Sequence, residues 1–99
     1  MMESLLQHTK ECYLCRKLYG IKTVINLHKH HIFEGTANRK KSEQHGLYIY
    51  LCGKHHNLSD LGIHSVKGYE VEVKREAQEA FEKEYGHDEF MQIFKRNYL

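Results

Sequence analysis

The fold is decided by the stretch LYIYLCGKHH at Leu47–His56. Its first half, Leu47–Leu51, is an apolar and aromatic run of the length of one β-strand. Its second half carries Cys52 and His55 in a Cys-x-x-His pair, and His56 follows directly. Cysteine sulfur and histidine nitrogen are ligands that zinc prefers. The stretch therefore predicts a strand that ends in half of a metal site.

The other half of this site lies upstream, at Cys12 and Cys15. A Cys-x-x-Cys pair alone also occurs in redox dithiols. Together with Cys52 and His55 it makes a Cys3His set, which is typical of structural zinc, and thiolates favour zinc over magnesium or calcium. The alternative is free buried cysteines with a surface histidine. We expect a structural Zn2+ held by these four side chains.

The chain has 99 residues and 3 cysteines, which allows one domain with a modest core that benefits from a metal. An odd number of cysteines cannot all pair within one chain, and no apolar run is long enough for a signal peptide or a membrane span. We therefore expect a reduced, cytoplasmic protein with no membrane partner. The oligomeric state stays open.

Two strands are predicted. Val24–Phe33 is rich in β-branched and apolar residues in rough alternation, and it is expected to pair with Leu47–Leu51 as a hairpin. The segment between them, Glu34–Gln44, is predicted to be a long polar loop. A short helix is expected from about His55, ended by Gly62.

Two further helices are predicted at the C-terminal end. Gly86 is expected to end the first of them, and Asp88 to be the N-cap of the second. Their apolar residues recur at the spacing of one helical face, so we expect core packing rather than a base-stacking surface. These residues are Val73, Ala77, Ala80, Phe81 and Tyr85 in the first helix and Phe90, Ile93 and Phe94 in the second.

The imidazoles left beside the zinc set are the functional clue. A structural zinc site needs only four ligands, yet three further histidines stand in adjacent pairs. His30 is next to His31, and His56 is next to the zinc ligand His55. In a strand, His28 and His30 share one face and His31 points to the other. The surplus indicates a second, open metal position where a nucleophile can be made, as in a metal-dependent hydrolase.

The positive charge gathers in the front of the chain. The formal net charge is +2, but residues 1–41 hold 8 Lys or Arg against 3 acids, whereas residues 69–99 hold 5 against 8. A basic face suits DNA or RNA, and Arg39, Lys40 and Lys41 are the candidate phosphate contacts. The alternative is an ordinary solvated surface.

The order of these motifs resembles the HNH endonucleases, which have a ββα-metal core, and more narrowly the small HNH proteins of phages and prophages. The resemblance rests on His30–Phe33 and Leu51–His56, with Gly35, Asn38-Arg39, Ser42-Glu43 and Gly46-Leu47 between them. It implies an α+β fold, a small zinc-stapled ββα-metal (HNH) core with a two-stranded hairpin and added C-terminal helices. Residues 1–99 would be a single nuclease domain, with the core at about 10–64 and the C-terminal helices at about 69–97.

The resemblance also implies roles for the surplus histidines. His30 stands where many members have a metal-binding Asp, His31 stands at the general base, and His56 is the final His that binds the catalytic metal. That metal would be Mg2+, Mn2+, Ni2+ or Zn2+. His64 is the candidate for a third imidazole ligand, with a surface-loop histidine as the alternative.

One position departs from the family pattern. Many members carry an Asn nine residues before the final His, where it pins the loop between the strands, and this chain has Leu47 there. Asn38, within the loop, is the candidate for the same role.

The function expected from the resemblance is hydrolysis of DNA phosphodiester bonds. A zinc-stapled nucleic-acid-binding module without catalysis is the alternative, because it would use the same Cys3His site and basic loop. A zinc-dependent protein adaptor is a third reading, favoured if the C-terminal aromatic residues are exposed.

Overall fold

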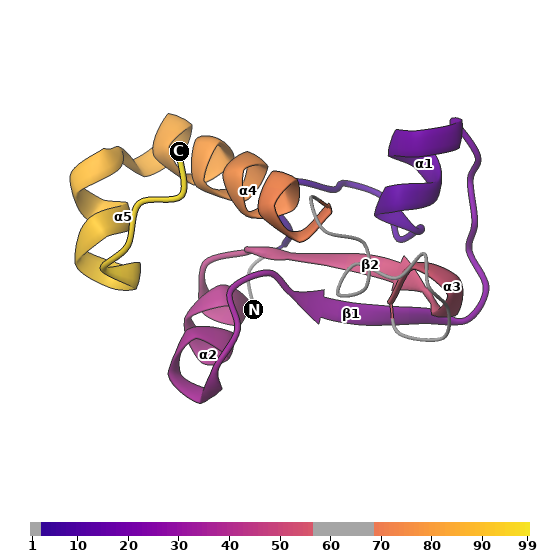
Figure 1. Ribbon diagram of the computed structural model, residues 1–99, viewed down its shortest axis with the longest axis horizontal. Helices are drawn as coiled ribbons and strands as arrows, with labels where there is room; N and C mark the ends of the chain where they lie inside the picture. The colour runs from indigo at the N-terminus through magenta and orange to yellow at the C-terminus, as the bar shows by residue number, and fades with distance from the viewer. Residues whose placement is uncertain (1–2, 57–68) are drawn as a thin grey trace.

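The computed structural model describes residues 3–56 and 69–99 and has an α+β fold. Its elements are α1 (Tyr13–Tyr19), β1 (Leu27–His31), α2 (Thr36–Gln44), β2 (Tyr48–Cys52), α3 (Gly53–His56), α4 (Tyr69–Tyr85) and α5 (His87–Phe94). Figure 1 shows α1 and α3 at one end of the two-stranded sheet, and α2 and α5 at the other.

The two strands form the predicted antiparallel hairpin, in which Leu27 pairs with Cys52 and His31 with Tyr48. The first strand is shorter than predicted. Asn26 has φ +53°, a left-handed conformation that interrupts an extended chain, and Ile25 before it is 70% exposed. The strand therefore begins only at Leu27, and three of its five residues are histidines.

Residues near the N-terminus cover the edge of β2 that β1 leaves open. The Ser4 hydroxyl donates to the carbonyl oxygen of Tyr48 at 2.6 Å, and the Gln7 side-chain oxygen accepts the N–H of Tyr50 at 2.9 Å. Side chains thus satisfy backbone groups that an exposed strand edge would leave to water or to another chain.

The expectation of a loop at Glu34–Gln44 is wrong, because most of this segment is helix α2. Among its residues only Ser42 is buried, so the sequence carries no apolar stripe by which to recognise a helix. Polar contacts hold the helix instead. Ser42 Oγ lies 3.2 Å from the N–H and 3.3 Å from the carbonyl oxygen of Phe33, and Lys41 Nζ donates to the carbonyl oxygen of Ile93 at 2.8 Å.

Helices α4 and α5 supply the aromatic part of the core. The ring centroids of Phe33 and Phe94 lie 4.6 Å apart and those of Phe33 and Phe90 lie 5.6 Å apart. Phe81 and Phe90 are 1% and 0% exposed, which confirms the core packing of these aromatic residues. The prediction is wrong for Tyr85, which is 49% exposed at the last position of α4. Gly86 ends α4 as predicted.

The predicted N-cap of the last helix is wrong by two residues. Helix α5 begins at His87, and Gly86, with φ +90°, is its N-cap in place of Asp88. One glycine makes the whole turn between α4 and α5, since it adopts positive φ without a steric penalty. Asp88 lies in the first turn of α5 instead.

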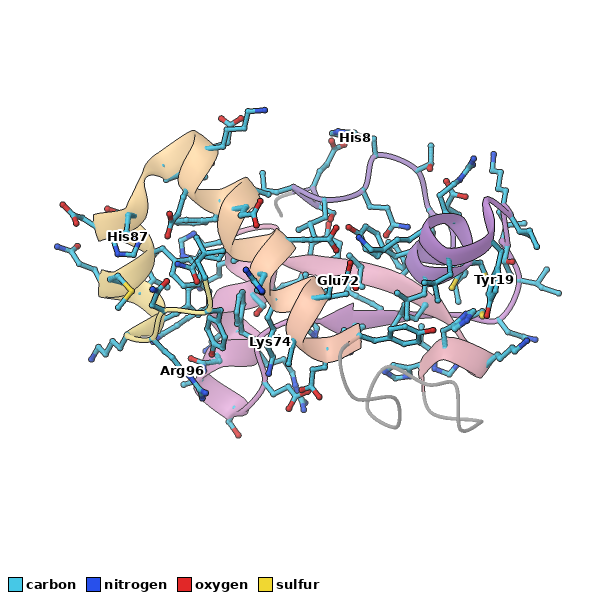
Figure 2. The ribbon with its side chains drawn as sticks, turned by 45° about the horizontal axis from the view of Figure 1, so that its top comes forward. His8, Tyr19, Glu72, Lys74, His87 and Arg96 are labelled. Atoms are coloured by element: carbon cyan, nitrogen blue, oxygen red, sulfur yellow. The ribbon has the colours of Figure 1, made fainter. Side chains whose placement is uncertain are left out.

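The molecule is elongated, with axial extents of 35 × 25 × 23 Å. Figure 2 shows Tyr19 of α1 and His87 of α5 near its opposite ends. In the two ranges that the structure describes, none of the helices has the length and apolar character needed to cross a membrane.

Candidate metal centre and adjoining cleft

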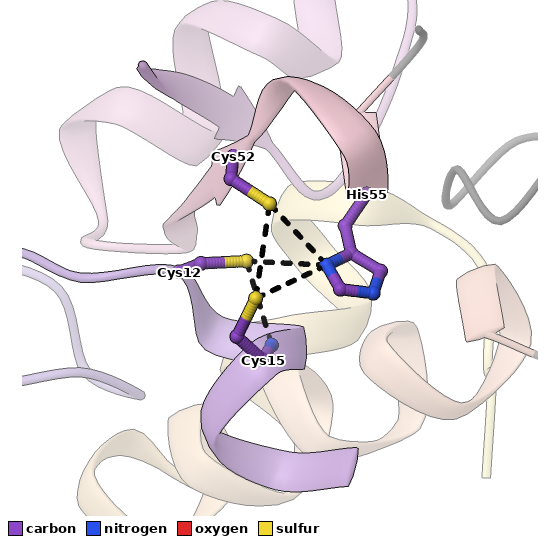
Figure 3. Close-up of side chains that lie close together, drawn as sticks. All are labelled: Cys12, Cys15, Cys52 and His55. Atoms are coloured by element: carbon purple, nitrogen blue, oxygen red, sulfur yellow. Dashed lines mark hydrogen bonds between the residues drawn. The ribbon is translucent and has the colours of Figure 1, made fainter. Parts of the chain in front are cut away.

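Three cysteines and one histidine that were predicted to bind zinc lie together at the end of the molecule formed by α1 and α3. Cys12, Cys15, Cys52 and His55 are all buried, and their ligand atoms lie within 4.8 Å of one another (Figure 3). None of the cysteines is in a disulfide. Among the described residues, this is the only group of three or more Cys, His, Asp or Glu gathered so closely.

The local backbone brings together the two residues of each ligand pair, Cys12 with Cys15 and Cys52 with His55. Cys12 is the N-cap of α1, where its sulfur accepts the backbone N–H of Cys15 at 3.4 Å. Cys52 is the last residue of β2, and α3 begins at the next residue. One helical turn therefore brings His55 back beside Cys52.

The spacing of the ligand atoms fits a tetrahedral metal ion. His55 Nδ1 lies 3.6 Å from the sulfur of Cys12 and 3.4 Å from the sulfurs of Cys15 and Cys52. The sulfurs of Cys15 and Cys52 are 3.8 Å apart. A tetrahedral zinc with ordinary bond lengths needs about 3.6 Å between sulfur and nitrogen and about 3.8 Å between sulfurs. These four separations match a tetrahedral zinc site, and the remaining sulfur pairs lie within 4.8 Å.

The electrostatics of the quartet also favour a cation. Burial raises the pKa of the Cys12 thiol to about 12, so a thiolate there needs a positive partner. At Cys52 burial also acts to raise the pKa, but the N–H of His55 and the neighbouring thiols outweigh it, and this pKa is lowered. Burial lowers the pKa of His55 and favours the neutral imidazole, which is the form that binds metals.

A polar cleft of about 500 Å³ lies beside the hairpin. All three surplus histidines of the predicted site line it, together with one of the predicted phosphate contacts. The lining residues are Lys29, His30, His31, Glu34, Arg39 and His56. His64, the candidate third ligand, lies outside the described residues.

On one face of β1, histidines gather against α3. His30 is 5% exposed, and its ring centroid lies 5.6 Å from that of His56. The ring centroid of His28, on the same strand face, lies 5.0 Å from that of His56. This face therefore places His56 beside both of these strand imidazoles.

On the other face of β1, His31 meets a carboxylate. Its Nε2 lies 2.7 Å from Glu43 Oε1 in α2, and because an ionised carboxylate only accepts, Nε2–H is the donor and Nδ1 can accept a proton. Lys29 Nζ donates to both oxygens of Glu43 at 3.2 Å. The His31 hydrogen bond, with help from Lys29, holds the pKa of Glu43 below its usual value although partial burial opposes this.

The three consecutive basic residues of α2 differ in their surroundings. Arg39 lines the cleft and Lys40 is exposed, whereas Lys41 joins α2 to the end of α5 through the carbonyl oxygen of Ile93. Asn38 lies in the first half of α2, and the turn into this helix is held by the hydrogen bonds of Ser42.

Sequence reasoning missed Glu43 and His28 as residues of this region. Arg39 and Glu43 are four residues apart, which places them on one face of a helix, but that signal is readable only once α2 is known to be helical. The signal for His28 was its shared strand face with His30.

Comparisons with known protein families, with curated proteins and with solved structures found no match.

Proposed function

We propose that this chain is a metal-dependent HNH endonuclease that hydrolyses DNA phosphodiester bonds, similar to the small nucleases of phages and prophages. One observation carries the proposal. The cleft beside the hairpin joins His30 and His31 of β1 and His56 of α3 with the cationic Arg39, next to a buried Cys3His quartet. The order of strand, strand and helix also supports a ββα-metal core, with α2 inserted in the connection between the strands.

In this proposal the quartet holds a structural Zn2+. Its atoms have the spacing of a zinc tetrahedron, and the ion would join α1 to the start of α3. Metal binding by such a site contributes directly to the folding free energy of a small domain. The zinc would therefore fix His56, which follows the ligand His55 directly.

His30 and His56 would hold a second divalent cation in the cleft. When bound, this cation offsets negative charge on the phosphate and on the leaving oxygen. His31, on the opposite strand face, would accept the proton of the attacking water through Nδ1, because Nε2–H is donated to Glu43. Arg39 and Lys40 would hold the DNA backbone through its phosphates.

A nucleic-acid-binding module without catalysis is the second candidate. Leu47, at the position of the family's Asn, is 0% exposed and belongs to the apolar core. It supplies no polar side chain to the catalytic loop. The adaptor reading is less favoured, because Phe81, Phe90 and Phe94 are at most 6% exposed, although Tyr85 is 49% exposed.

Nicking of supercoiled plasmid tests the proposal. Zinc-loaded protein should convert the plasmid to open circles with at least one of Mg2+, Mn2+, Ni2+ and Zn2+, and a chelator should stop the reaction. Metal analysis of the chelator-treated protein should show that the structural zinc is still bound. The loss of activity then cannot be due to unfolding of the protein. Tight DNA binding in a gel-shift assay without nicking under any of the metals would favour the binding module.

A further inference from the structure

His56 contacts two imidazoles rather than one. Its ring centroid lies 5.0 Å from that of His28 and 5.6 Å from that of His30. Two imidazoles bound to one metal through ring nitrogens, at angles of 90° to 120°, have centroids about 4.6 to 5.6 Å apart for ordinary metal–nitrogen distances. Both observed separations fall in this range.

The backbone explains why His28 belongs to this group. His28 and His30 are two residues apart in β1 and so share one strand face. They pair with Leu51 and Ile49 of β2, and β2 leads directly into α3, which contacts both strands. His56 therefore reaches the strand face from which both histidines project.

The three imidazoles are more loosely gathered than the Cys3His quartet. Among the described residues, only that quartet has every ligand atom within 4.8 Å of every other. Imidazole rings turn readily about χ2, which is a broad torsion. Ring rotation is therefore a direct way to turn the nitrogens of His28 and His30 toward His56.

We propose that His28 is a third ligand of the cation that His30 and His56 hold, which makes this a tris-imidazole site. The inference rests on the proposed function for the other two ligands and deepens it by naming the class of metal. Three neutral nitrogen donors suit Zn2+, Ni2+ or Co2+, whereas Mg2+ and Ca2+ prefer oxygen ligands. The site should therefore select a transition metal over Mg2+.

Calorimetric titration of the zinc-loaded protein with Ni2+ and with Mg2+, in the absence of DNA, tests this. Wild type should bind one Ni2+ in addition to its structural zinc and should bind Mg2+ far more weakly. His28→Ala should weaken Ni2+ binding by about tenfold or more, since even outer-shell partners of a metal contribute 10- to 100-fold. His8→Ala, which removes an exposed histidine outside the cleft, should bind Ni2+ as wild type does.

Two controls keep the result interpretable. Elemental analysis after the titration should show one zinc per chain in every variant, so that Ni2+ has not replaced it in the quartet. Circular dichroism should show that His28→Ala is folded. Unchanged Ni2+ affinity in folded His28→Ala, or equal affinities for Mg2+ and Ni2+, would overturn the inference.

The plasmid assay separates this inference from the proposed function. If His28→Ala loses Ni2+ affinity while wild type nicks no DNA, the metal site stands and the nuclease proposal fails. If wild type nicks DNA while His28→Ala binds Ni2+ normally, the nuclease proposal stands and the role of His28 is overturned.

Discussion

His31 Nε2 and Glu43 Oε1 lie 2.7 Å apart, joining the end of β1 to the last turn of α2. The contact determines which ring nitrogen carries the proton, because the carboxylate requires a donor at Nε2. The contact also limits rotation of the His31 ring. Among the described residues, this ring has one aromatic neighbour, Tyr48, at a centroid distance of 6.5 Å. Glu43 is therefore placed to orient the proposed general base.

Glu43→Ala should slow plasmid nicking by about tenfold or more, as a misoriented base loses part of the 10²- to 10⁴-fold that general-base catalysis supplies. Glu43→Gln keeps an oxygen acceptor and should retain more activity than Glu43→Ala. Single-turnover rates at saturating protein measure this. Ni2+ affinity should stay at the wild-type value in both variants. If Glu43→Ala nicks plasmid at the wild-type rate, Glu43 does not position the base.

Gly46→Ala should destabilise the fold more than Gly20→Ala does. Both glycines have positive φ, +71° and +65°, so alanine at either site adds roughly 1–2 kcal/mol of backbone strain. At Gly46 a Cβ would also clash with the backbone carbonyl oxygen of Glu3, whereas at Gly20 it would meet nothing within 4 Å. Urea denaturation of the zinc-loaded variants measures the difference. Equal free energies of unfolding would show that the N-terminal segment does not pack against Gly46.

The basic residues of α2 should separate into DNA contacts and a structural contact. Changing Arg39 and Lys40 together to Ala should weaken DNA binding and flatten its salt dependence, because fewer counterions are released. Lys41→Ala should lower stability, since it removes the hydrogen bond to Ile93, and should change the salt slope less. Fluorescence anisotropy with a labelled duplex at several salt concentrations tests this. An unchanged slope in the double variant would exclude this helix as a DNA contact.

Cys52→Ser should lose zinc and leave the domain largely unfolded, because structural zinc sites provide about 10–16 kcal/mol of apparent binding free energy. Circular dichroism and elemental analysis measure the two effects. Wild type freed of zinc by unfolding in denaturant with excess chelator, a harsher treatment than the chelator addition that stops nicking, should refold only when zinc is returned, whereas the variant should not refold. Reduced wild type that is folded without any bound metal would refute the structural role of the site.

The hairpin and the Cys/His quartet were predictable from the sequence because their signals are local. The run at Leu47–Leu51 has the length and composition of a strand, and the quartet consists of two short-spaced pairs. The aromatic core of α4 and α5 was predictable in the same way, from helical periodicity.

Helix α2 was not predictable from apolar periodicity, since it buries only Ser42. Its contacts run from Ser42, Glu43 and Lys41 to residues 9, 12 and 52 positions away along the chain. Such long-range polar partners leave no periodic pattern in the sequence. The pairing of Glu43 with His31 was missed for the same reason.

His30 and His31 are neighbours on opposite faces of β1, and the proposed mechanism gives them different roles. Their alanine variants separate these roles. Plasmid nicking and Ni2+ calorimetry should be measured on His31→Ala, His30→Ala and His56→Ala. We predict that His31→Ala loses most cleavage while Ni2+ affinity and DNA affinity stay near wild type. His30→Ala and His56→Ala should lose cleavage and Ni2+ affinity together, with partial recovery at high metal concentration. Cleavage by His31→Ala at the wild-type rate would show that His31 is not the general base and that the proposed mechanism is wrong.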